Sequence, residues 1–157
     1  MATNFLQESG FLVAPFNLMT TELNALASGA NAISSVGGTS GVFTQTNFGS
    51  GIFGVIHFVA GGAFTVVAGG YIAGWFLYSP DSGSTFERVT AALDMPRSPD
   101  FVIPLATGAT TTGDVFQSTG LVRLPWWSTK VYVGNRSGIA LSASGHIIQC
   151  GPVAVQY

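Results

Sequence analysis

His146 and Cys150 are the two residues whose types and spacing come nearest to a chemical site. They stand four positions apart, so on a strand they would lie on the same face. A zinc site needs three or four ligands, and the only other histidine, His57, lies inside an apolar run. We therefore expect one packed thiol and one hydrogen-bonded histidine, and no metal site.

The sequence contains no complete motif for catalysis or for cofactor binding. Residues 49–54 fit the pattern G-x-G-x-x-G, but dinucleotide binding requires a helix after it and an acid about 20 residues on. Here a β-rich run follows, and the next acid is Asp81. No G-x-S-x-G elbow occurs, and the seven Asp and Glu residues form no spaced pair. The sequence predicts no enzyme and no cofactor.

Trp126 and Trp127, which follow Pro125, are the most distinctive pair in the chain. Adjacent residues on a strand face opposite ways, so at most one of them would enter a core. Three interpretations stay open: packing in the core and loops, contact with a partner subunit, and a sugar-binding platform. The sugar-platform interpretation also includes Trp75 and Tyr132.

The elements that carry these residues are poor in charge. Residues 23–80 contain no Asp, Glu, Lys or Arg, and charged residues make up 8 % of the chain, against about a quarter in ordinary soluble domains. A surface with so little charge is usually hidden, either in lipid or against other protein copies. The five basic residues are scattered, so the clustered positive charge that nucleic-acid binding requires is missing.

Residues 51–78 form an apolar stretch that is long enough to span a bilayer as a helix. Glycine pairs at 61–62 and 69–70 divide it into β-branched and aromatic runs, which is the pattern of strands and turns. No Lys or Arg near its ends would orient it in a membrane. The pattern favours strands over a membrane helix.

Length and pattern predict a single all-β domain over residues 1–157. Residues 1–19 are expected to form an apolar arm or a first strand, and residues 20–29 a short helix. Short strands separated by turns indicate a sandwich or a barrel, and residues 85–93 fit a strand or a short helix. Because the apolar runs are nearly continuous, we expect strands covered on both faces, partly by a neighbouring subunit.

The chain also lacks the features that keep β proteins apart from one another. It has one lysine, whereas free-standing sheets guard their edges with lysine, inward charges and proline. Such a protein tends to aggregate unless other copies or a larger lattice cover it. The single cysteine excludes an intrachain disulfide, and the N-terminus does not fit a signal peptide, which favours the cytoplasm as the place of synthesis.

Four segments carry a resemblance to a known family: TELNALASG at 21–29, PDFVIPL at 99–105, RLPWWSTKVYVGNRSGIAL at 123–141 and PVAVQY at 152–157. On these segments the chain resembles the small capsid decoration, or cement, proteins of tailed double-stranded DNA bacteriophages. The resemblance implies a jelly-roll-like antiparallel β-sandwich, a dimer or trimer, and binding outside the shell at its symmetry axes. There such a protein bridges neighbouring capsomers against the pressure of the packaged DNA. The resemblance implies no active-site residues.

The leading hypothesis is therefore a structural virion protein on the capsid exterior, made in the host cytoplasm. Its expected partners are the major capsid protein and other copies of itself, with no nucleic acid and no membrane. A carbohydrate- or receptor-binding virion module is the second hypothesis, and a small membrane protein is the third. The residues expected to contact the capsid or a partner subunit are Phe5, Leu6, Phe11, Leu12, Phe16, Trp126 and Trp127.

Overall fold

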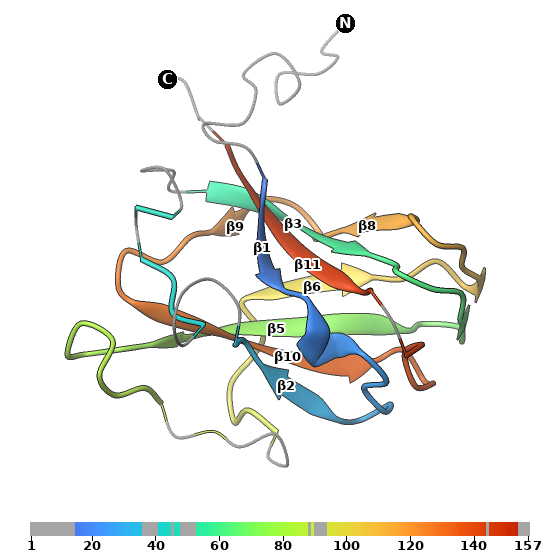
Figure 1. Cartoon of the computed structure of the whole chain (residues 1–157), viewed down its shortest axis with the longest axis horizontal. Helices are drawn as coiled ribbons and strands as arrows, with labels where there is room; N and C mark the ends of the chain where they lie inside the picture. Colours follow the sequence, from blue (N-terminus) through green and yellow to red (C-terminus); the bar gives the residue numbers. More distant parts are fainter. Residues whose placement is uncertain are drawn as a thin grey trace, which may run out of the picture.

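Two antiparallel sheets face each other and enclose a hydrophobic core (Figure 1). The structure is a computed structural model that describes residues 15–35, 41–44, 46–47, 53–87, 89, 94–143 and 145–153. The predicted all-β class with antiparallel sheets is confirmed, and the two facing sheets make the fold a β-sandwich.

The first sheet is built around β3, which pairs with β11 on one side and with β8 and β9 on the other, while β1 extends the sheet beyond β11. The second sheet has the order β2, β10, β5, β6, and a small two-stranded sheet joins β4 to β7. Within the described residues the strands are β1 (Phe16–Met19), β2 (Asn31–Ile33), β3 (Phe53–Val59), β4 (Thr65–Val66), β5 (Tyr71–Tyr78), β6 (Phe101–Pro104), β7 (Gly108–Ala109), β8 (Val115–Gln117), β9 (Val122–Arg123), β10 (Thr129–Arg136) and β11 (Ile147–Val153).

The main strand pairs are nested along the chain. The first strand pairs with the last, β2 pairs with β10, β3 pairs with β8 and β9, and β5 pairs with β6. Residues 79–100 connect β5 to β6 at the centre of this nest. Loops from distant parts of the sequence therefore meet at each end of the sandwich (Figure 1).

The two long central strands differ in how they are buried. Along β3 buried and half-buried residues alternate, with Ile56 and Phe58 turned to the core. Along β5 every residue from 72 to 77 is buried. A strand of that kind must be covered on both faces of its sheet.

The chain itself covers the outer face of the second sheet. Trp75 on β5 lies opposite Tyr132 on β10, with their ring centroids 5.7 Å apart. For β5 described residues of the segment between β5 and β6 supply this second cover, and a contribution from a neighbouring subunit stays a prediction. The residues of this connecting segment that pack on the outer cluster are Phe86, Val89 and Met95.

The predicted helix over residues 20–29 is not confirmed. The structure has a single 3-10 turn at Thr21–Leu23, after which Asn24 is extended and Ala25 has a positive φ of 54°. The backbone N–H of Ala25 donates to the carbonyl oxygen of Ser142 at 3.0 Å, and that of Gly29 donates to Asn135 at 2.8 Å. These tertiary hydrogen bonds replace the bonds that a helix would have made within the segment.

Gly74 on β5 provides a test of the core, because an added Cβ would collide with the Phe101 ring. We expect Gly74→Ala to destabilise the protein by about 1–3 kcal/mol, since the ring would have to leave its site. Urea unfolding measures this, with Val67→Ala at an exposed position as the control. Equal unfolding midpoints for the two variants would contradict this account of the core.

Candidate functional site

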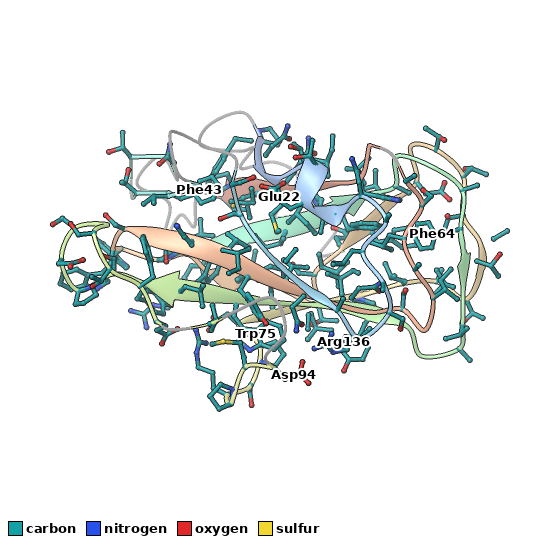
Figure 2. All side chains as sticks on the ribbon, turned by 60° about the horizontal axis from the view of Figure 1, so that its bottom comes forward. Glu22, Phe43, Phe64, Trp75, Asp94 and Arg136 are labelled. Atoms are coloured by element: carbon teal, nitrogen blue, oxygen red, sulfur yellow. The ribbon has the colours of Figure 1, made fainter. Side chains whose placement is uncertain are left out.

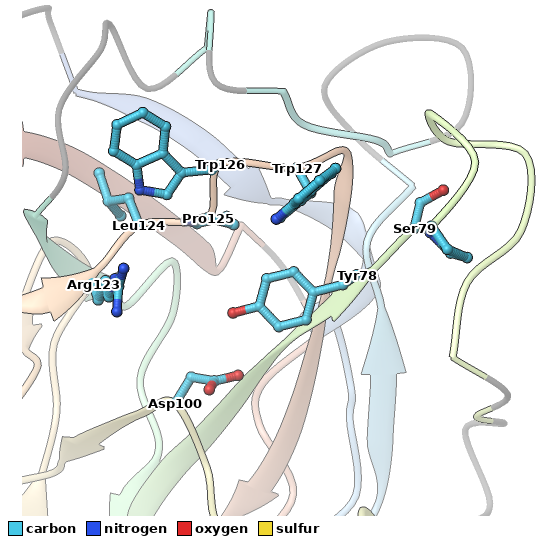
Figure 3. Close-up of a pocket in the computed structure, with 9 residues that line it drawn as sticks. Tyr78, Ser79, Asp100, Arg123, Leu124, Pro125, Trp126 and Trp127 are labelled. Atoms are coloured by element: carbon cyan, nitrogen blue, oxygen red, sulfur yellow. The ribbon is translucent and has the colours of Figure 1, made fainter.

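A hollow of about 670 Å³ opens at one end of the sandwich, where β5 ends and β10 begins (Figure 3). Three segments line it: residues 78–80 from the end of β5 into the following loop, Asp100 before β6, and residues 123–127 from β9 into the following loop. These segments meet because the nested pairing brings β5, β6 and β9 to the same end of the fold.

Asp100 is fixed by the free edge of β5. Its backbone N–H donates to the carbonyl oxygen of Gly74 at 2.9 Å, and its Oδ2 accepts from the N–H of Phe76 at 2.7 Å. Arg97 donates to the same Oδ2 at 2.8 Å and, through Nη2, to the carbonyl oxygen of Phe76 at 2.7 Å. Side chains thus satisfy the backbone groups of β5 beyond the end of β6, as an edge strand requires.

Trp126 and Trp127 are 53 % and 66 % exposed. From the sequence, at most one of the two rings was expected to enter the core. Neither ring does, because both residues lie in a loop and not on a strand. Leu124 and Pro125, which precede them, are buried and anchor the loop. Both tryptophan rings therefore remain available at the rim of the hollow.

Several polar groups of the hollow have no partner within the described part of the chain. The guanidinium of Arg123, the hydroxyl of Tyr78 and the two indole N–H groups make no hydrogen bond or ion pair there. Burial raises the pKa of Tyr78 above its usual value of 10, and the negative charge of Asp100 raises it further. The phenol therefore stays neutral at physiological pH and can both donate and accept.

The remaining predicted contact residues divide into two groups. Phe5, Leu6, Phe11 and Leu12 lie outside the described residues. Phe16 lies in β1 and turns to the core, where its ring centroid is 6.0 Å from that of Phe43. Phe16 therefore belongs to a strand of the sandwich, which is the first-strand alternative for this segment, and its role as a capsid contact stays a prediction.

Two of the aromatic rings that were considered as sugar platforms are not accessible to a ligand. Trp75 and Tyr132 are buried beneath the connecting segment, and the Trp75 indole donates to the carbonyl oxygen of Arg97 at 2.9 Å. Sequence reasoning instead missed Tyr78, Asp100 and Arg123. Arg123 stands three residues before the tryptophan pair, which is a signal in the sequence, but only strand pairing brings Tyr78 and Asp100 to it.

His146 and Cys150 have the structural roles that their sequence context suggests. The His146 ring is buried, stacks on Phe58 at 5.4 Å and accepts at Nδ1 from the N–H of Gly61 at 3.2 Å. Its Nε2 lies 2.8 Å from the hydroxyl of Ser142. Burial raises the pKa of Cys150 to about 12. No group of three or more possible metal ligands occurs among the described residues.

The outer face of the first sheet is a second surface of interest. Ile147, Val59 and Val115 form an aliphatic row across β11, β3 and β8, and Val115 is 58 % exposed. The next row contains Gln149 and Gln117 on either side of His57. Strands β1, β3, β8 and β11 contain no Asp, Glu, Lys or Arg, and the short strand β9 adds Arg123 opposite Phe53 at the far end of β3. The face around the aliphatic row therefore carries little charge.

Comparisons with known proteins give no relative: no family model, curated protein or solved structure matches the chain. The membrane-helix alternative for residues 51–78 is wrong for the described residues 53–78, which contain β3, β4 and β5. In the parts of the chain that the structure describes, no helix has the length and apolar character needed to cross a membrane.

The buried ring of His146 is expected to make the stability of the protein depend on pH. Burial lowers its pKa below the usual value of 6.5, so the unfolded chain binds a proton more readily than the folded one. Its stabilising contribution is present above pH 6.5 and is lost as the pH falls toward the folded pKa, by at most about 1.4 kcal/mol per pH unit.

Urea unfolding between pH 7.5 and 5.5 measures this effect. We expect a steeper loss of stability in the wild type than in His146→Gln, which cannot take up the proton. His57, whose pKa burial also lowers, contributes equally to both proteins. The same slope in both would show that protonation of His146 does not oppose folding.

Proposed function

We propose that this protein is a structural virion protein that binds the outside of a bacteriophage capsid and cements neighbouring capsomers. The observation that carries the proposal is the outer face of the first sheet, with its aliphatic row of Ile147, Val59 and Val115 and its uncharged neighbours. A partly exposed sheet face with so little charge suits burial against another protein.

The distribution of charge supports this choice of face. The ion pairs among the described residues join Arg97 to Glu87 and Asp100, and Arg136 to Asp94. They belong to β10 and to the segment that covers the second sheet, and Figure 2 shows Asp94 and Arg136 on the same side as Trp75. The second sheet therefore presents a solvated, charged layer, whereas the first sheet presents the surface suited to docking.

The strand order supports the finer fold assignment that we propose, a jelly roll. An eight-stranded double sheet of two Greek keys is one way in which antiparallel β proteins limit their free edges. The orders β1-β11-β3-β8/β9 and β2-β10-β5-β6, with the first strand paired to the last, fit a long hairpin that is rolled into two sheets. Jelly rolls are frequent in viral capsid proteins and lectins.

The proposal includes the partners and the place of action. The major capsid protein would contact the aliphatic row, other copies of this chain would complete a dimer or trimer, and the protein would act on the capsid exterior without catalysis or a cofactor. The resemblance of residues 99–105 and 123–141 to cement proteins supports this assignment.

Val115→Lys tests the docking face, because it adds a charge at an exposed site with little effect on the core. Val67→Lys, at a position that is 44 % exposed beside β4, is the matched control. We expect Val115→Lys to weaken binding to capsids that lack this protein by tenfold or more, since a charge is costly in an apolar interface. Cosedimentation measures binding, and equal binding by both variants would contradict the proposed face.

Removal of residues 1–14 tests the contribution of the predicted arm. The deletion has to stop before β1, because Leu18 and Met19 are fully buried and their loss would unfold the sandwich. We expect the shortened protein to keep its β circular dichroism spectrum and to bind capsids more weakly. Unchanged capsid binding would remove the arm from the mechanism and leave the sheet face as the contact.

A further inference from the structure

We propose that the hollow formed by residues 78–80, Asp100 and residues 123–127 binds a saccharide that carries a carboxylate group. This binding site goes beyond the cementing role, and it lies at the end of the sandwich and not on the outer face of the first sheet (Figure 3).

Exposed aromatic rings supply the first part of the argument. Tyr78, Trp126 and Trp127 border the same hollow, and each is more than one third exposed. Exposed tryptophans are costly in water and mark sites where one face of a ligand is apolar and its edge is polar. The C–H face of a pyranose ring is such a ligand surface, because its hydroxyl groups project from the ring edge.

Hydrogen-bonding groups around the rings supply the second part. The two indole N–H groups can donate, the phenol of Tyr78 can donate and accept, and Oδ1 of Asp100 can accept, and none of them is bonded to another described residue. A few polar groups that converge on an aromatic hollow give a small-molecule site its specificity. Sugar hydroxyls match such a mixture of donors and acceptors.

Charge decides which kind of saccharide fits. Asp100 accepts a hydrogen bond from Arg97 at 2.8 Å, and Arg97 also pairs with Glu87 at 3.4 Å. Arg123 has no acidic partner within the described ranges. Its guanidinium is therefore left to bind a carboxylate of the ligand, which it can do through two parallel hydrogen bonds. A uronic or sialic acid unit combines that carboxylate with a pyranose ring.

Size and rigidity favour a small ligand over a protein partner. A volume of about 670 Å³ lies in the range of small-molecule pockets. Both walls are held in place: Leu124 and Pro125 anchor one loop, and in the other the Ser79 hydroxyl donates to Asp81 at 2.8 Å and accepts from the N–H of Gly83 at 2.7 Å. A site that is already formed loses little entropy on binding.

Calorimetry and tryptophan fluorescence with defined sugars test the proposal. The acidic probes are trigalacturonate and sialyllactose, and the neutral controls are maltotriose and lactose. Trp75 is buried, so a change in fluorescence on adding sugar reports on Trp126 and Trp127. We expect the wild type to bind the acidic probes at least tenfold more tightly than the neutral controls.

Two variants separate stacking from charge recognition. Trp127→Ala should weaken binding of the acidic probes tenfold or more, because it removes a stacking surface. Arg123→Gln should reduce binding of the acidic probes to the level of the neutral sugars. Lys130→Gln removes the same charge from a side chain that lies over Phe86, and it should bind like the wild type. Unfolding midpoints check that each variant is folded.

Three outcomes would overturn the proposal. The first is the absence of binding of both acidic probes to the folded wild type. The second is equal binding by Arg123→Gln and Lys130→Gln, which would mean that net charge and not the hollow attracts the sugar. The third is tight binding of a tetra-aspartate peptide in place of the sugars, which would assign the hollow to a protein partner. Because Trp127→Ala leaves the aliphatic row intact, its capsid binding reports on the cementing role separately.

Discussion

The structure depends on burying the β5–β10 pair on both faces. The first sheet covers the inner face of this pair, and Phe86, Val89 and Met95 of the segment between β5 and β6 pack on the outer face. A charged group in the middle of either strand would have to leave water without a partner, which is costly. The buried polar side chains are instead hydrogen-bonded: Nδ2 of Asn135 donates to the carbonyl oxygens of Leu26 and Ile139 at 2.8 Å each.

This central pair also explains how the two surfaces arise. The described residues of the segment between β5 and β6 pack on the second sheet, whereas the outer face of the first sheet keeps its aliphatic row, in which Val115 is 58 % exposed. The same segment returns to β6 through Asp100, which bonds the free edge of β5 and so lies beside Tyr78. A flat apolar face and a polar aromatic hollow thus follow from a single chain path, and their different chemistry suits different partners.

Predictions from sequence succeeded where one local pattern was sufficient. Glycine pairs and β-branched runs correctly indicated strands in the described part of 51–78. Predictions failed where distant contacts decided the outcome. The helix signal at residues 20–29 was lost to hydrogen bonds with Asn135 and Ser142. Likewise, Trp75 was considered as an exposed sugar platform, but residues between β5 and β6 bury it. No periodicity in the sequence indicates that contact.

The sequence by itself determined the β class and the poverty of charge, because these depend on residue types and on neighbours along the chain. Only the tertiary structure decided which apolar strands are covered by the chain itself and which face is left open. It also decided that Tyr78, Asp100 and Arg123 meet the tryptophan pair. The physical reason is the nested antiparallel pairing, which joins segments that are distant in sequence, so that their contacts leave no local signal.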